Sequence, residues 1–256
     1  MARASCPCSL PPARCRLDAR PGRPRHGMRL PPNKIDEKRV AASKPQALGM
    51  DATCRHNMRT TLMENRIAQI HRQTKETDVA VELNLDGVGK YEIDSGVGFL
   101  DHMLTHLSKH SGIDLVVKAK GDLQVDAHHT VEDIAICMGE CLLKALVDKK
   151  GITRYGHSSV PMEDALANVS VDLSGRPNCV YNVEYRTDKI GDFDVECVEE
   201  MLRSFSNAGR FNLHINVPYG TNSHHIAEAI FKGLGKALGT AVSLRGTDVP
   251  STKGIL

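Results

Sequence analysis

An internal repeat limits what this chain can fold into more than any other feature of its sequence. Two His-His-x-x-Glu clusters, His128–Glu132 and His224–Glu228, lie almost a hundred residues apart. A recurring pattern at a fixed spacing is typical of a duplicated structural unit. We therefore predict two repeats, residues 63–157 and residues 158–256, each about 90 residues long and too small to bury a good core alone. We expect their sheets and helices to pack together.

The alignment of the two repeats extends beyond the clusters. When Leu115 is placed on Leu213, His102 falls on Glu200, and the two clusters coincide after a gap of two residues. Alternating apolar and polar residues predict strands, and apolar residues at helical spacing predict helices. The predicted order is strand 78–85, helix 98–110, strand 113–119 and helix 128–147, and then strand 167–172, helix 198–205, strand 211–217 and helix 223–242.

Residues 1–62 form an irregular leader, rich in Arg, Pro, Ala and Ser, which we exclude from the fold. Such a segment is either an organelle transit peptide or an upstream extension read from a start codon placed too early. Met63 opens the patterned sequence, which favours the second interpretation. We expect a cytoplasmic protein, or a plastid one if the leader is a transit peptide.

The composition excludes several classes of partner. The chain of 256 residues is 41% hydrophobic and 25% charged, with a net charge of +2 and no Trp. This charge is too small to indicate a nucleic-acid or membrane surface, and no apolar run approaches the ~20 residues that span a bilayer. Cys137 and Cys141 lie four residues apart on an apolar helical stretch, without CxxC spacing, which favours buried reduced thiols.

The duplicated clusters have the spacing of metal ligands. On a helix, His128 and Glu132 share one face while His129 points about 100° away, and the second cluster repeats this geometry. We expect one site from His224, Glu228, His129 and His102, and a second from His128, Glu132, His225 and Glu200. Imidazole and carboxylate ligands suit manganese, iron, cobalt or zinc, and they leave positions open for chemistry. The alternative is that these residues only cap helix starts, as Asp126, Asn222 and Ser223 also could.

Other polar residues are candidates for substrate binding. Arg154, Arg176, Lys232 and Lys253 lie at turns or on a helix face near the inferred site, and Ser251-Thr252-Lys253-Gly254 has the make-up of an anion clamp. Taken singly, each cation is also typical of a solvated surface. Glu76 precedes the first strand and is a candidate general acid or base, or else a surface carboxylate beside Lys75.

Several motifs closely resemble one enzyme family. Gly98–Leu104, Asp126–Asp133, Asn222–Ala229 and the ending Pro250–Gly254 occur in the order found in the imidazoleglycerol-phosphate dehydratases of histidine biosynthesis. The resemblance runs from about Met63 to Leu256 and leaves the leader outside.

The resemblance implies a fold, an assembly and a reaction. The fold is α+β, with duplicated half-domains that each have a four-stranded sheet with helices on one face, of the ribosomal protein S5 domain 2-like class. The assembly is a 24-subunit homo-oligomer with two Mn²⁺ per active site at subunit contacts. The enzyme is a hydro-lyase that converts imidazole glycerol phosphate to imidazole acetol phosphate and water.

The resemblance also implies roles for individual residues. Its metal positions are His102, His128, His129, Glu132, His224, His225 and Glu228, and its substrate positions are Glu76, Arg154, Arg176, Lys232, Ser251, Thr252 and Lys253. Glu200 stands where many members have a metal-binding His, and we keep it as a ligand because a carboxylate also binds manganese. His106 stands where some members have a phosphate-contacting Gln, and we leave it out, along with His71, His110, His157 and His214.

The reaction must remove an unactivated C–H proton. Metal binding at both ring nitrogens would hold the ring as an imidazolate that feeds electrons toward the departing hydroxyl, through a diazafulvene-like intermediate. We predict Glu76, Glu228 and His129 as catalytic residues, with Glu76 the candidate for proton transfer. A metal-binding or storage oligomer without catalysis is the alternative, although it gives the cations and the Ser-Thr-Lys segment no purpose. A dinuclear hydrolase would need an Asp-rich set of ligands at strand ends, which the chain lacks.

Overall fold

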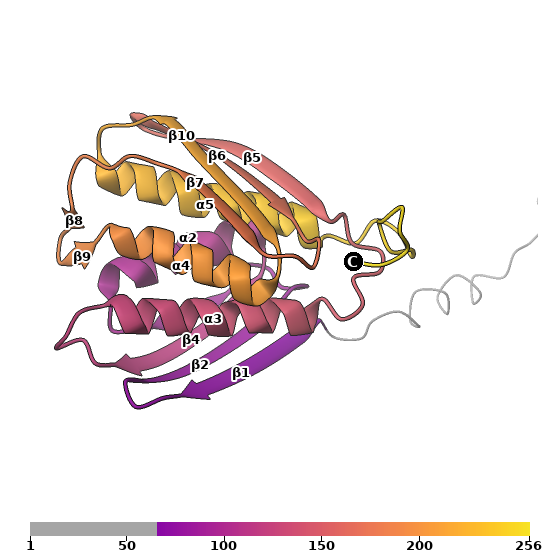
Figure 1. The fold of residues 1–256 in the computed structure, drawn as a ribbon, viewed down its shortest axis with the longest axis horizontal. Coiled ribbons are helices and arrows are strands. Elements are labelled where there is room, and N and C mark those ends of the chain that lie inside the picture. Colours follow the sequence, from indigo (N-terminus) through magenta and orange to yellow (C-terminus); the bar gives the residue numbers. More distant parts are fainter. Residues whose placement is uncertain (1–65) are drawn as a thin grey trace, which may run out of the picture. The chain divides into compact units, whose positions relative to one another are not determined.

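The computed structural model describes residues 66–256, and the predicted leader lies outside these residues. Two four-stranded sheets enclose four helices (Figure 1). The first half consists of β1 (Ile67–Gln73), β2 (Thr77–Asn84), β3 (Tyr91–Asp94), α2 (Gly98–Ser111), β4 (Asp114–Gly121) and α3 (His128–Ala145). Its strand order is β1-β2-β4-β3, with β3 and β4 parallel and the other pairs antiparallel.

The second half repeats this topology. It consists of β5 (Tyr155–Met162), β6 (Ala165–Asp172), β7 (Asn178–Asn182), the small hairpin β8 (Lys189–Ile190) and β9 (Phe193–Asp194), α4 (Glu196–Gly209), β10 (Asn212–Tyr219) and α5 (Ser223–Val242). Its order is β5-β6-β10-β7, again with one parallel pair, β7 and β10. The prediction of a duplicated α+β fold is confirmed. β5 begins at Tyr155 and so straddles the predicted boundary between the repeats.

The central strands form because their apolar residues alternate. In β2, Val79, Val81 and Leu83 are buried, while the residues between them face away from the helices. This period of two places one apolar face against the helices and one polar face outward. The sequence did not predict the edge strands of the two sheets, β1, β3, β5 and β7, or the separate hairpin of β8 and β9.

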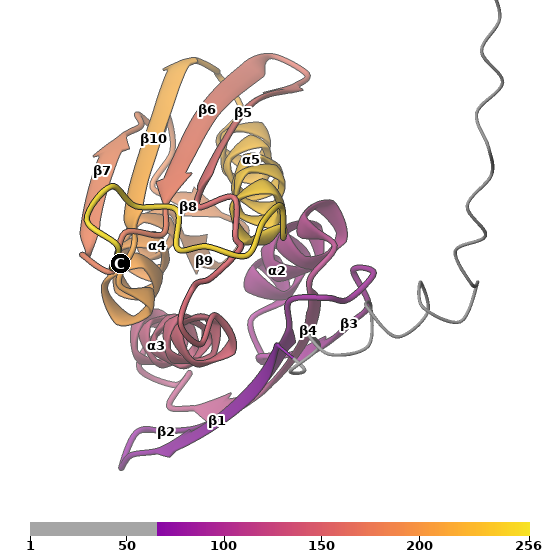
Figure 2. The same ribbon diagram turned by 90° about the vertical axis from the view of Figure 1, so that its right-hand side faces the viewer.

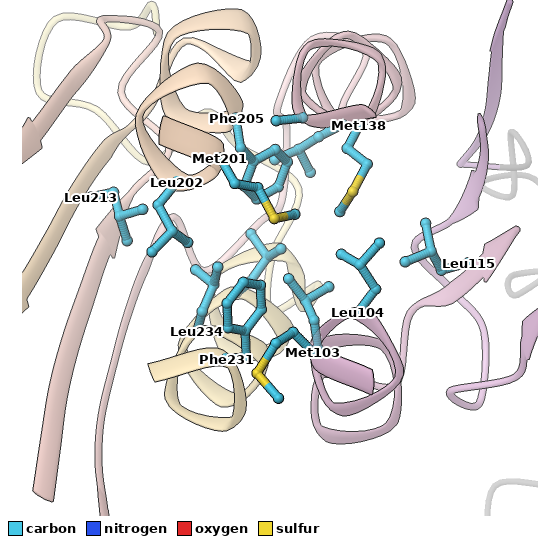
Figure 3. Close-up of a cluster of buried hydrophobic side chains, with 14 of the residues drawn as sticks. Met103, Leu104, Leu115, Met138, Met201, Leu202, Phe205, Leu213, Phe231 and Leu234 are labelled. Atoms are coloured by element: carbon cyan, nitrogen blue, oxygen red, sulfur yellow. The ribbon is translucent and has the colours of Figure 1, made fainter. Parts of the chain in front are cut away.

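The helices of the two halves pack on each other between the sheets (Figure 2). α2 lies against α5 and α3 lies against α4, so each contact joins one helix from each half. The core between them is fully buried and includes Met103 and Leu104 of α2, Met138 of α3, Phe205 of α4 and Phe231 of α5 (Figure 3). Burying a side chain of this size stabilises the fold by about 1.5–3 kcal/mol. None of the helices within residues 66–256 is long and apolar enough to cross a bilayer.

Glycines allow these helices to approach closely. A Cβ on Gly139 of α3 would lie 2.6 Å from the Cβ of Ala208 and 2.6 Å from the backbone nitrogen of Gly209, both on α4. A Cβ on Gly235 of α5 would lie 2.8 Å from the carbonyl oxygen of Leu107 on α2. Larger residues at these positions would therefore push the paired helices apart.

We predict that Gly139→Ala lowers the free energy of unfolding by about 1–3 kcal/mol, because the added methyl group overpacks the α3–α4 contact. Chemical denaturation of the variant and the wild type measures the difference. Gly98→Ala is the matched control, since a Cβ on this helical glycine meets nothing within 4 Å. Equal stability of Gly139→Ala and the wild type would show that the α3–α4 contact has room for a methyl group at this position.

Candidate functional site

Three predicted metal ligands meet where the start of α5 lies against α2. The ligand atoms of His102, His224 and Glu228 all lie within 4.8 Å of one another. The Nε2 atoms of His224 and His102 are 3.1 and 3.5 Å from Oε2 of Glu228. His224 and Glu228 share one face of α5 because they are four residues apart, and the packing of α2 on α5 brings His102 to them. Two imidazoles and one carboxylate form a donor set that fits a divalent transition metal ion.

His106 belongs to this cluster, although the sequence analysis left it out. Its Nε2 lies 3.3 Å from Nε2 of His102 and 3.3 Å from Oε1 of Glu228. The signal was present in the sequence, since His102 and His106 are separated by four residues, the spacing of neighbours on a helix face. Lys232, one turn after Glu228, also contacts Oε1, at 2.6 Å.

Burial and charge shift the pKa values of Glu228 and His106. The side chain of Glu228 is only 8% exposed. Burial alone would raise the pKa of the Glu228 carboxyl, but the hydrogen bond from Lys232 and the neighbouring positive charges outweigh it and lower the pKa to about 2. Burial lowers the pKa of His106 to about 4, despite the attraction of Glu228. Near neutral pH, Glu228 is therefore an anion and His106 a neutral imidazole, which are the protonation states of metal ligands.

The histidine pairs do not cap their helices. The side chain of Asn222 accepts hydrogen bonds from the backbone nitrogens of His224 and His225, at 2.9 and 3.3 Å, and so caps α5. Asp126 accepts a hydrogen bond of 2.8 Å from the backbone nitrogen of His128 at the start of α3. The imidazole rings at both helix starts are left for other partners, which argues against the capping interpretation.

The second histidine of each pair points to a carboxylate outside its helix. Nδ1 of His129 lies 3.0 Å from Oδ2 of Asp122 and 3.9 Å from Oε2 of Glu76. The hydrogen bond with Asp122 raises the pKa of His129. Nδ1 of His225 lies 2.6 Å from Oδ1 of Asp164. Neither Asp122 nor Asp164 had a recognisable spacing in the sequence, because both come from loops that only the folded sheet brings to these helices.

The remaining predicted ligands do not form a second trio of this kind. Glu200 on α4 accepts a hydrogen bond of 2.9 Å from the hydroxyl of Ser204, which occupies the position equivalent to His106. His128 is the first residue of α3 and Glu132 lies four residues further along this helix, which packs against α4. Among residues 66–256, the trio of His102, His224 and Glu228 is the one group of three ligands within 4.8 Å.

The predicted anion-binding residues divide between the two ends of α5. Lys232 contacts Glu228 in the group of His102, His106, His224 and Glu228, which we call the metal cluster because these are candidate metal ligands. The backbone nitrogen of Arg154 donates a hydrogen bond to the carbonyl oxygen of Ala241, near the other end of α5. At 1.5 Å per residue, Ala241 lies about 20 Å along the helix from Glu228. The Arg154 guanidinium binds both carboxylate oxygens of Asp172, at 2.7 and 3.2 Å, and the carbonyl oxygen of Pro250, at 2.9 Å. The C-terminus, marked C in Figure 1, lies at the same end of the molecule as the last turn of α5.

Arg176 and the last residues of the chain complete the distant group. Arg176 is exposed beside Gly175, whose added Cβ would lie 3.0 Å from the terminal carbon of Leu256. Ser251, Thr252 and Lys253 follow directly after Pro250, which Arg154 holds. We call this set of residues, Arg154, Arg176, Ser251, Thr252 and Lys253, the cation group. Within one chain, the cation group and the metal cluster lie too far apart to bind one small molecule together.

Comparison with known proteins decides the family. A model of the imidazoleglycerol-phosphate dehydratase family matches residues 95–238, more than half of the chain. The chain belongs to this dehydratase family. Imidazoleglycerol-phosphate dehydratases from Desulforudis audaxviator and an Exiguobacterium species are 55% and 53% identical to it, over 75% and 74% of this chain and 98% and 97% of their own lengths. The predictions of the family and of a hydro-lyase enzyme are confirmed.

Solved structures of the family share the fold. The imidazoleglycerol-phosphate dehydratase of Staphylococcus aureus is similar with a TM-score of 0.64 and 41% identity, over 70% of this chain and 99% of that one. The Pyrococcus furiosus protein has a TM-score of 0.64 and 40% identity, over 73% of this chain and all of that one. The duplicated arrangement of sheets and helices is therefore the fold of this dehydratase family.

We predict that Glu228→Gln weakens Mn²⁺ binding at least tenfold, because an amide replaces the only anionic donor of the trio. Equilibrium dialysis of the full-length chain against Mn²⁺ measures the affinity. Glu199→Gln is the matched control, since Glu199 lies on α4 in a surface ion pair with Arg203, and both side chains are 43% exposed. Unchanged Mn²⁺ affinity in Glu228→Gln would show that the trio does not bind the ion.

Proposed function

We propose that this chain catalyses the metal-dependent dehydration of D-erythro-imidazole glycerol phosphate to imidazole acetol phosphate in histidine biosynthesis. The observation that carries the proposal is the trio of His102, His224 and Glu228 in a member of the dehydratase family. We place the enzyme in the cytoplasm, as predicted from the sequence.

We propose two Mn²⁺ ions per active site. The trio would hold one ion, and His128, Glu132 and Glu200 on the paired helices α3 and α4 would hold the other. When bound, the ions supply Lewis-acid polarisation of the imidazole ring of the substrate. His129 and His225 would each add a nitrogen ligand to a site, since Nδ1 of each ring is already engaged by an aspartate.

The residues of the chain itself would bind the substrate and move protons. Glu76 lies 3.9 Å from His129, and its side chain is 57% exposed, so it can reach both the metal-binding end and a bound substrate. A carboxylate with this freedom suits the transfer of the C–H proton. Lys232 neutralises Glu228 beside the cluster and offers a cation to the substrate phosphate.

The substrate phosphate needs the cation group, and the distance along α5 separates that group from the metal cluster. We therefore propose that the active site combines the metal cluster of one copy with the cation group of another. A closed homo-oligomer provides such contacts by symmetry, and the expected assembly is the 24-mer. A distance of about 20 Å within one chain supports this arrangement, because the substrate is much shorter.

The experiment that tests the function is turnover of imidazole glycerol phosphate by the full-length chain, followed through the absorbance of the enolised product. We predict turnover with Mn²⁺, loss of turnover in EDTA, and recovery when Mn²⁺ is restored, because the trio is built for a divalent ion. A folded chain that binds Mn²⁺ but gives no product would instead support metal binding or storage without catalysis.

A further inference from the structure

The second histidine of each cluster contacts an aspartate to which the proposed function assigns no role. Asp164 lies in the turn between β5 and β6, and it contacts Nδ1 of His225 at 2.6 Å. Asp122 directly follows β4, and it contacts Nδ1 of His129 at 3.0 Å. An ionised carboxylate only accepts hydrogen bonds, so each histidine must carry its proton on Nδ1. The lone pair of each neutral ring is then on Nε2.

Asp164 is itself fixed by the start of α5. Its Oδ2 accepts hydrogen bonds from the backbone nitrogens of Thr221 and Asn222, at 2.6 and 3.0 Å, and from the hydroxyl of Thr221. These three donors occupy one carboxylate oxygen and leave the other for His225. Asp164 therefore ties the β5–β6 turn, the helix start and the histidine ring into one rigid unit.

The internal repeat shows what Asp164 corresponds to in the first half. Leu83 pairs with Leu115 and Val171 pairs with Leu213, and Leu115 and Leu213 are equivalent. Counting back along β2 and β6 from these pairs makes Glu76 the equivalent of Asp164. The carboxylate at this position is thus duplicated, but its two copies behave differently.

The difference follows from the loop residue that replaces Asp122 in the second half. β10 has one extra residue between Asn216 and Tyr219, so Gly220 is the equivalent of Gly121, and Thr221 is the equivalent of Asp122. The close contacts agree, since a Cβ on Gly121 would meet Thr130 and a Cβ on Gly220 would meet Ile226, the residues that follow the two histidine pairs. Thr221 has no carboxylate to accept a hydrogen bond from His225, and its backbone nitrogen and hydroxyl donate to Asp164 instead. In the second half the turn residue Asp164 must hold the histidine. In the first half Asp122 does so, and Glu76 stays 3.9 Å away and largely exposed.

We propose that Asp164 and Asp122 are positioning residues that hold His225 and His129 in the Nδ1–H form with Nε2 presented to a metal ion. The same arrangement releases Glu76 from this task, which explains why one of two duplicated carboxylates is available for proton transfer. The inference rests on the proposed function for the identity of the ligand.

Asp164→Asn tests the positioning role. The amide oxygen will accept the three donors of Thr221 and Asn222, which turns the amide NH₂ group toward Nδ1 of His225. Nδ1 then becomes the acceptor, the proton moves to Nε2, and Nε2 can no longer bind a metal ion. We expect Mn²⁺ binding at the affected site to weaken 10- to 100-fold, the usual loss when the partner of a ligating histidine is changed.

Two readouts separate this inference from the proposed function. Solid-state ¹⁵N NMR of metal-free, histidine-labelled full-length chain gives the tautomer, with His225→Gln identifying the signal, and dialysis gives the Mn²⁺ affinity. The expected result is Nδ1–H in the wild type and Nε2–H in Asp164→Asn. Asp78→Asn is the matched control, since Asp78 contacts Nε2 of His71 at the same 2.6 Å but on the surface, and it should leave Mn²⁺ affinity unchanged.

The comparison of Asp122→Asn with Glu76→Gln tests the division of roles in the first half. Asp122→Asn should weaken Mn²⁺ binding, whereas Glu76→Gln should lower kcat and leave Mn²⁺ binding intact. An Nε2–H tautomer of His225 in the wild type would overturn the inference without any variant, even if the enzyme is active. Equal loss of Mn²⁺ affinity in Glu76→Gln and Asp122→Asn would show that both carboxylates position His129, and would contradict the claim that Glu76 is free for proton transfer. A wild type that neither binds Mn²⁺ nor turns over substrate would instead contradict the proposed function.

Discussion

The close packing of helices from opposite halves is the contact on which the rest of the molecule depends. Gly235 of α5 lets α2 approach until a Cβ at this position would touch the backbone of Leu107, and Gly139 does the same for α3 and α4. This contact buries the apolar faces that neither sheet-and-helix unit could cover alone. It also brings His102 to Glu228, so the interaction that stabilises the duplicated fold is the one that builds the metal cluster.

The length of α5 separates the two groups of predicted site residues within one chain. The helix begins at the metal cluster, and near its other end Ala241 accepts a hydrogen bond from Arg154 of the cation group. Because a rigid helix keeps these ends about 20 Å apart, we propose that a substrate that needs both lies between copies of the chain. Duplication gives the chain two histidine pairs, and Asp122 and Asp164 hold the second histidine of each pair through its Nδ1 atom.

The sequence predicted the elements whose side chains repeat with a clear period. The alternation of Val79, Val81 and Leu83 predicted a half-buried strand, and the two clusters in register predicted the duplication. β3 and β7 were missed because both are short edge strands without a buried residue, and β7 has three apolar residues in a row, Cys179, Val180 and Tyr181, where an alternating pattern was sought. His106 was missed although its spacing from His102 was visible. Asp122 and Asp164 could not be found, since only tertiary packing brings their loops to a histidine.

The central claim is that the metal cluster of one copy works with the cation group of another, and co-assembly of two inactive variants tests it most directly. Glu228→Gln removes the cluster, and Arg176→Ala removes an exposed cation that forms no structural ion pair among residues 66–256. Each variant alone should be inactive. Oligomers that contain both variants in equal amounts should recover about a quarter of wild-type activity. At each site, half of the copies supply an intact metal cluster and half supply an intact cation group, and the two are combined at random. If the mixed oligomers stay as inactive as the separate variants, the two groups act within one chain and the account is wrong.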